Sequence, residues 1–272
     1  MKITLIVPYF GSWPPWFYAF LLSCKWNPSV QWLFYTDCGT PRGAPENVRF
    51  VAGSLEGLSA LASRKLGFAV NIAHGYKVCD LRPAFGRVFS DYLSGSDFWG
   101  HCDVDVIWGD IRGFIDDDIL AQHDVISARK HNIAGHFTLY RNTEKMSGLY
   151  TLIEDFEARL RTDINYWLDE RGMTPLVRVL ENRGFARVYW PRFLLNFASP
   201  ATERPSDLSG YSDGWCWKRG KLYDQTAGGG EIMYLHFMTW KDSLRQVDFS
   251  WPDEPESFRV SSTAILAGGE CP

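Results

Sequence analysis

Strand-like and helix-like hydrophobic patterns alternate along the first half of the chain. Mostly apolar segments typical of strands occur at 3–10, 30–37, 48–53 and 98–110. Between these segments, apolar residues recur at helical spacing in 14–26, 58–72 and 82–93. The alternation predicts an α/β fold in which a mostly parallel sheet is flanked by helices on both faces. In such sheets ligands bind at the carboxyl ends of the strands.

The second half of the chain has a more mixed pattern. Strands are predicted at 124–129, 136–142, 186–190 and 232–240, and helices at 143–160 and 174–184. Gly, Ser, Pro and Asp dominate residues 199–230, which we interpret as an irregular excursion because an apolar strand follows. We therefore expect one domain over residues 1–250 and a loose C-terminal tail at 251–272.

Composition and charge exclude several classes of protein. A chain of 272 residues that is 46% hydrophobic can bury a sizeable core, and its formal net charge of −4 argues against a nucleic-acid partner. The apolar run at residues 1–8 is too short for a signal peptide or a membrane span. The six cysteines are scattered without a CxxC pair, so we expect them to be reduced and the protein to be cytoplasmic.

Aromatic residues are unusually frequent, at 15% of the chain with 12 tryptophans. Such rings either fill the core or stack on sugars and bases at the surface. The segment DGWCW at 213–217 illustrates the two alternatives, since its rings either stack on an acceptor sugar or hold their own loop in place.

Two carboxylates interrupt the apolar segment FWGHCDVDVIWGD at 98–110. Side chains two residues apart in a strand point the same way, so Asp103 and Asp105 would face one site at the strand end. One or two carboxylates commonly hold Mg²⁺ or Mn²⁺ together with substrate phosphates. Two carboxylates beside aromatic residues are costly to bury unless a cation neutralises them. The alternative is a pair of solvated or salt-bridged aspartates, because D-x-D by itself is a weak motif.

Four separated blocks resemble GT-A-type glycosyltransferases: IVPYFG, FYTD, FWGHCDVDVIWGD and HNIAGHFTLYRN. The resemblance covers residues 1–170 and extends faintly to YLHFMTWK at 234–241. It is greatest to a bacterial family linked to surface-polysaccharide synthesis. It implies a single GT-A-like, Rossmann-like domain that transfers a sugar from a nucleotide-sugar, a UDP-sugar, to a carbohydrate acceptor. Peripheral contact with a lipid-linked acceptor at the inner membrane face stays open.

The same resemblance implies a Mn²⁺ or Mg²⁺ site. Asp105 would bind the metal directly, and Asp103 would contact the ribose or the metal through water. His236 and Lys241 resemble the metal-binding His and diphosphate-binding Lys of glycogenin-like enzymes, although the spacing here is one residue shorter and lacks the glycine. His236 therefore either binds the metal or is a core residue of an apolar strand.

Nucleotide-binding residues are implied at the ends of the first two strands. The loop that would hold the base consists of Pro8, Tyr9, Phe10 and Gly11. Tyr9 either stacks on uracil or belongs to a plain turn. Thr36 and Asp37 end the second strand, where Asp37 either accepts a hydrogen bond from the base or ribose or caps a turn.

Further candidates flank the metal strand. By the resemblance, Lys77 and Arg82 either contact phosphate or are solvated, and Asp80 either contacts the nucleotide or caps the following helix. His136 would line the sugar pocket. An inverting transferase needs a carboxylate base, and Asp169 and Glu170 are candidates for it unless they form a solvated helix end.

Two rival functions remain at this stage. A sugar nucleotidyltransferase usually has a glycine-rich, basic loop after the first strand, which PYFGSWPPW lacks. A non-catalytic carbohydrate-binding protein would use the aromatic residues but would need neither a nucleotide nor the paired aspartates. Metal-dependent binding of a nucleotide would distinguish the glycosyltransferase from the carbohydrate-binding protein.

Overall fold

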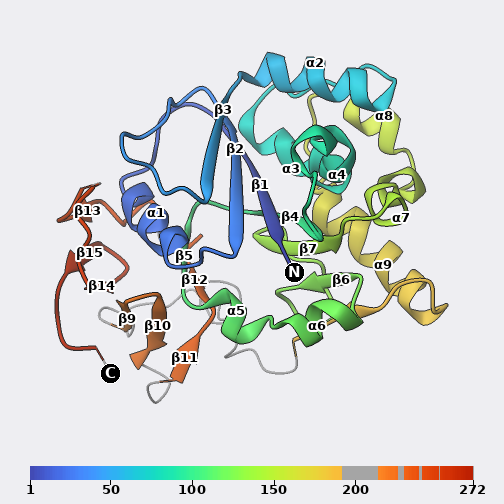
Figure 1. Ribbon diagram of the computed structural model, residues 1–272. Helices are drawn as coiled ribbons and strands as arrows, with labels where there is room; N and C mark the ends of the chain where they lie inside the picture. Colours follow the sequence, from blue (N-terminus) through green and yellow to red (C-terminus); the bar gives the residue numbers. More distant parts are fainter. Residues whose placement is uncertain (192–213, 226–229, 239–240, 251, 272) are drawn as a thin grey trace.

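A seven-stranded sheet forms the centre of the computed structural model, which describes residues 1–191, 214–225, 230–238, 241–250 and 252–271 (Figure 1). Its strand order is β3-β2-β1-β4-β7-β6-β8. The strands are β1 (Ile3–Tyr9), β2 (Val30–Thr36), β3 (Val48–Ala52), β4 (Phe98–Cys102), β6 (Val125–Ser127), β7 (Phe137–Arg141) and β8 (Val188–Tyr189). All pairs are parallel except those that β7 makes with β4 and β6. The predicted α/β fold with a mostly parallel sheet is confirmed.

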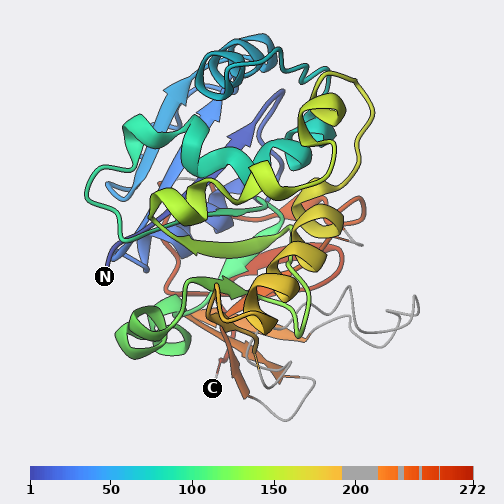
Figure 2. The same cartoon turned by 90° about the vertical axis from the view of Figure 1, so that its right-hand side faces the viewer.

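Helices cover both faces of this sheet (Figures 1 and 2). One face packs against α2 (Leu55–Leu66), α3 (Val78–Leu81), α4 (Phe85–Val88), α7 (Glu144–Ser147), α8 (Phe156–Leu160) and α9 (Met173–Asn182). The other face packs against α1 (Phe17–Lys25), α5 (Ile111–Phe114) and α6 (Asp117–Gln122). Each face therefore buries an apolar core of its own, as the two-sided sheet pattern requires.

Several predicted helices are shorter or interrupted. The segment 82–93 forms η2 (Arg82–Ala84), α4 and η3 (Ser90–Tyr92), and 143–160 forms α7, η4 (Leu149–Leu152) and α8. In the second segment Gly148 ends α7 and Asp155 adopts a left-handed backbone with φ 55°, so one continuous helix is wrong. The segment 58–72 stops at Leu66, because Gly67 caps α2 with φ 82°.

The predicted strand at 98–110 is also wrong, because the chain changes sheets within it. After β4, residues 103–105 form a turn, and β5 (Val106–Trp108) pairs antiparallel with β12 (Tyr234–His236) in a separate two-stranded sheet. The Trp16 indole donates to the Val104 carbonyl at 3.0 Å, which fixes the middle of the turn. Both aspartates consequently lie in a fixed turn at the carboxyl end of β4.

A six-stranded sheet packs against α1, to the left of and below this helix in Figure 1. Its order is β11-β10-β9-β14-β15-β13. The strands are β9 (Trp215–Lys218), β10 (Lys221–Asp224), β11 (Gly230–Ile232), β13 (Gln246–Val247), β14 (Ser257–Val260) and β15 (Ala264–Ala267). The loose tail predicted beyond residue 250 is therefore wrong, because β14 pairs with β9 and buries Phe258 and Val260. The single strand predicted at 232–240 is divided between β11 and β12, with 239–240 outside the described residues.

The second sheet also corrects two other predictions. The described part of the excursion at 199–230 includes the β9–β10 hairpin, whereas 192–213 and 226–229 lie outside the described residues. Trp215 and Trp217 of DGWCW are fully buried in the core, so they are not a surface stacking platform. Cys216 and Cys271 form a disulfide, so the expectation of six reduced cysteines is wrong for this pair. Among the described residues, no helix is long and apolar enough to cross a membrane.

Candidate functional site

The turn between β4 and β5 lies next to β12, and together they gather three potential metal ligands. Nε2 of His236 lies 3.9 Å from Oδ2 of Asp103 and 3.7 Å from Oδ1 of Asp105. One ligand atom from each residue lies within 4.8 Å of the other two. A backbone hydrogen bond also joins the two segments, because the Phe237 N–H donates to the Asp105 carbonyl at 3.1 Å.

The charge states of these residues fit a divalent cation. Burial opposes ionisation of Asp103, but Arg82 and His236 outweigh it and hold its pKa below the ordinary value. Burial lowers the pKa of His236 against the opposite effect of the two aspartates, which favours the neutral imidazole that metals bind. Two ligands held at about 2.1 Å from one ion lie roughly 3.0–4.2 Å apart, which includes both His236 distances. The residues present therefore fit such an ion.

A cleft of about 490 Å³ opens beside the aspartates. Among its lining residues are the predicted Pro8, Tyr9, Phe10, Arg82, Asp103, Asp105 and Lys241. Nζ of Lys241 lies 3.4 Å from Oδ2 of Asp105. Burial lowers the pKa of Lys241, but Asp105 outweighs it and the pKa is raised, so the side chain is a cation at neutral pH. The cleft thus combines an aromatic loop with carboxylates and two basic side chains.

The predicted base-binding loop is held in place by the end of β2. Gly11 has φ 104°, which favours glycine, and its N–H donates to Oδ1 of Asp37 at 2.7 Å. The Tyr9 ring stacks on Trp13 with centroids 5.4 Å apart. Thr36 is buried and its hydroxyl accepts from the Cys38 N–H at 3.1 Å. In this structure Thr36 and Asp37 stabilise the loops beside the cleft, while Tyr9 lines the cleft itself.

Lys77 and Asp80 lie inside the protein. Both side chains are fully buried, and they form an ion pair at 3.0 Å. Lys77 also donates to the Arg159 and Ile164 carbonyls at 2.8 and 2.6 Å, and Asp80 accepts from the Tyr166 N–H at 2.9 Å. Predicted contacts of Lys77 and Asp80 with a nucleotide are therefore wrong, because their polar atoms already join α3 to the segment before η5 (Leu168–Gly172).

Arg82 links the aspartate turn to η5. Its guanidinium contacts Oδ1 of Asp103 through Nη2, and its Nη1 donates to Oδ2 of Asp169 at 2.8 Å and to the Gly135 carbonyl at 2.9 Å. Burial raises the pKa of Asp169 to about 6 against the lowering effect of Arg82. Glu170 is only partly buried, and its Oε1 accepts from Arg129 at 3.0 Å and from the Gly135 N–H at 2.8 Å. The alternative of a solvated helix end is thus wrong for Asp169, which is 3% exposed.

His136 supports the metal-binding side from within the core. It is 2% exposed, its Nε2 lies 2.7 Å from the Tyr234 hydroxyl, and its ring stacks on His236 with centroids 4.2 Å apart. Burial holds its pKa well below the ordinary value. Tyr234 was missed by the sequence analysis, although residues 234 and 236 share one side of a strand and the alternation of YLH could have indicated it.

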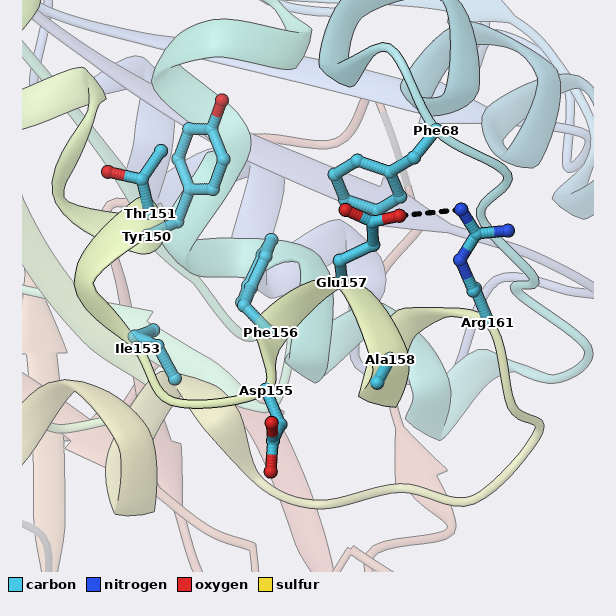
Figure 3. Close-up of a pocket in the computed structure, with 9 residues that line it drawn as sticks. All are labelled: Phe68, Tyr150, Thr151, Ile153, Asp155, Phe156, Glu157, Ala158 and Arg161. Carbon is cyan, nitrogen blue, oxygen red and sulfur yellow. Dashed lines mark hydrogen bonds and ion pairs between the residues drawn. The ribbon is translucent and has the colours of Figure 1, made fainter.

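A second hollow lies beside α8 (Figure 3). Figure 3 shows Phe68, Tyr150 and Phe156 around it and the ion pair between Glu157 and Arg161, whose atoms are 2.6 Å apart. Its lining includes neither aspartate of the β4–β5 turn. The chemistry therefore places the candidate site in the cleft beside Asp103 and Asp105.

Comparison with known proteins adds a family. Residues 5–266 match a family of unknown function, DUF6625. The chain belongs to DUF6625. No curated protein matches this DUF6625 chain. Among solved structures, it is similar to the galactosyltransferase LgtC in complex with donor and acceptor sugar analogs, with 14% identity over 87% of this chain and 86% of that chain and a TM-score of 0.43. It is also similar to apo mouse xyloside xylosyltransferase 1, with 9% identity over 86% and 96% of the two chains and a TM-score of 0.43.

Proposed function

We propose that this protein is a metal-dependent glycosyltransferase that moves a sugar from a nucleotide-sugar donor, a UDP-sugar, to a carbohydrate acceptor. The observation that carries the proposal is the convergence of Asp103, Asp105 and His236 from distant parts of the chain at the wall of one cleft. The motifs that resemble GT-A-type enzymes supply the choice of reaction. Surface-polysaccharide synthesis is the biological role that the same resemblance favours.

In this proposal the residues in and beside the cleft have three separate roles. Asp103, Asp105 and His236 hold Mn²⁺ or Mg²⁺, which acts as a Lewis acid on the leaving diphosphate when bound. Lys241, a cation beside Asp105, stabilises the negative charge that the departing nucleotide carries away. Tyr9 provides the aromatic surface for the base, and its stack on Trp13 fixes the ring orientation.

Asp169 and Glu170, the two predicted candidates for the catalytic base, differ in solvent exposure. Both oxygens of Asp169 bond within the chain, to Arg82 and to the Glu170 N–H, so we assign it to positioning Arg82 and the aspartate turn. The carboxylate of Glu170 is 34% exposed and uses Oε1 for both of its bonds to Arg129 and Gly135. Glu170 is therefore the better candidate to contact the acceptor hydroxyl or the transferred sugar.

Thermal unfolding with UDP, GDP, CMP and ADP, each with and without Mn²⁺, tests the donor site. Ligand at about a hundred times its Kd stabilises the native state by roughly 2.7 kcal/mol. At about 2–4 °C per kcal/mol this is a shift of several degrees. We expect the shift with UDP, only when Mn²⁺ is present, and we expect it to vanish in Asp105→Asn.

A matched control is Asp118→Asn, which alters an exposed carboxylate in the first turn of α6 and should keep the wild-type response. A shift with another nucleotide would retain the reaction and change the donor. If no nucleotide shifts the transition but simple sugars do, the carbohydrate-binding alternative replaces the enzyme. Incubation of the protein with UDP-sugars, followed by detection of released UDP, then distinguishes transfer from binding alone.

A further inference from the structure

Two exposed aromatic side chains lie on neighbouring segments, one of which lines the candidate cleft. Tyr76, in η1 (Gly75–Lys77), lines the cleft and is 67% exposed. Trp167 directly precedes η5 and is 46% exposed, although most tryptophans of the described chain are buried. None of the roles assigned above to the nucleotide or metal uses either ring.

Hydrogen bonds fasten the segment that carries Trp167 to the wall of the cleft. This segment runs from α8 to α9 along one side of the molecule (Figure 2). His74, another cleft residue, makes a hydrogen bond of 2.9 Å to the Asp163 carbonyl, and Lys77 donates to the Ile164 carbonyl. The segment that precedes Trp167 is therefore fastened to the wall that contains Tyr76.

The backbone at Trp167 is strained, and the side chain of Trp167 is exposed while those of the next two residues are buried. Its φ of 54° and ψ of 46° are left-handed values that a bulky residue rarely adopts. Asn165 holds this conformation by accepting from the Trp167 N–H at 3.0 Å, and the Trp167 carbonyl accepts from the Arg171 N–H at 2.7 Å. The next residues, Leu168 and Asp169, are buried while the indole stays in solvent. Such strain is concentrated at functional sites in proteins.

Trp167 is also close in sequence to the chemistry of the cleft. Asp169, two residues later, holds Arg82, and Arg82 holds Asp103 of the proposed metal site. A ligand on the indole would therefore contact the same segment that positions Arg82 and the aspartate turn. The occupant expected there is the second substrate.

The surroundings of the ring favour a sugar over a lipid. The Arg171 guanidinium stacks over one face of the Trp167 ring, 4.5 Å from its centre, so a sugar would stack on the opposite face; Asp163 and Asn165 supply polar groups on the same segment. A sugar ring has apolar C–H faces and a polar rim, which match an aromatic face surrounded by hydrogen-bonding groups. An acyl chain would instead need a continuous apolar surface.

We propose that Trp167 and Tyr76 bind the carbohydrate acceptor by stacking against its sugar rings. The identity of the bound sugar as the acceptor rests on the proposed glycosyltransferase function. The binding of a sugar to these rings can be measured without any transfer reaction, so the two proposals can fail separately.

Fluorine NMR of the protein labelled with fluorotryptophan is the first experiment. Trp167→Phe assigns the Trp167 resonance by its disappearance. Lactose, N-acetyllactosamine and methyl glycosides of glucose and galactose are then titrated as probes. We expect the Trp167 resonance to shift with at least one of them, while Trp26, which is 45% exposed at the end of α1, stays unchanged.

Kinetics with the most active donor and acceptor provide the second readout. Trp167→Ala should raise the KM for the acceptor about tenfold, as expected for loss of a stacked aromatic contact, with a much smaller change in the KM for the donor. Trp167→Phe should recover most of the loss, and Tyr76→Ala should also raise the acceptor KM. Trp26→Ala is the matched control and should behave as the wild type.

Three outcomes overturn the inference. One is a Trp167 resonance that no saccharide shifts while another tryptophan responds. A second is a response of Trp167 to phosphatidylglycerol vesicles and not to saccharides, which assigns the rings to a lipid surface. A third is an unchanged acceptor KM in a folded Trp167→Gly variant, which removes the ring while glycine accommodates the left-handed backbone.

Discussion

The buried pair of Lys77 and Asp80 gives a sharp test of structural against ligand-binding roles. Both side chains are fully buried, with Nζ and Oδ2 at 3.0 Å. In Asp80→Asn the ammonium of Lys77 stays in the interior without its counter-charge. Removal of one partner of a buried ion pair costs about 3–5 kcal/mol. For a chain of this size we expect the melting temperature to fall by roughly 10 °C.

The loss of stability should depend on the burial of the ion pair. Lys65 and Asp91 form an ion pair of similar length, 2.6 Å, but Asp91 is 70% exposed. Asp91→Asn should therefore change stability by less than about 1 kcal/mol. Adding Lys77→Met to Asp80→Asn should recover part of the loss, because the uncompensated charge is then removed.

The assay is urea and thermal unfolding by circular dichroism, combined with UDP and Mn²⁺ titration below the transition. Folded Asp80→Asn should bind nucleotide as the wild type does. A variant that melts within about 2 °C of the wild type and has lost its response to UDP would refute the reasoning, because Asp80 would then act on the ligand and not on the fold.

Two other variants test the electrostatics and the second sheet. The pKa of Asp169 is about 6 in the fold against an ordinary 3.8, so its contribution to stability is present below pH 3.8 and is lost as the pH rises through 6. The stability of the wild type relative to Asp169→Asn should therefore fall by about 2.4 kcal/mol between pH 4 and pH 7 in urea titrations, and a constant difference would contradict the buried carboxyl. The Cys216–Cys271 disulfide spans 55 residues, so Cys271→Ser or reduction should cost up to about 4 kcal/mol. Six titratable thiols in the denatured, unreduced protein would show that this bond does not form.

The sequence predicts the first sheet well because its signal is local. The strands β1, β2 and β3 are predominantly apolar segments, and parallel pairing follows from the helices between them. The pair Asp103 and Asp105 is visible for the same reason, as two charges within apolar sequence. Their placement in a turn is not visible, because Val104, Val106 and Trp108 have the same apolar character whether the chain continues in one sheet or enters another.

Other parts of the site depend on partners far away in the sequence. His236 reaches the aspartates only because β12 pairs with β5, and Lys77 is buried by carbonyls of Arg159 and Ile164, more than eighty residues away. Local patterns carry no information on such pairings. The same limit applies to Cys216 and Cys271, since spacing does not define which cysteines meet.

The pairing of β5 with β12 has a consequence for the order in which the protein is made. During synthesis the chain emerges from its N-terminus, and the large sheet through β8 needs only the first 190 residues. At that stage both aspartates are present but His236 is still to be made. The proposed reactivity toward nucleotide-sugars would thus be withheld from the unfinished polypeptide, and a ribosome-stalled fragment ending before β12 should bind Mn²⁺ more weakly than the finished protein.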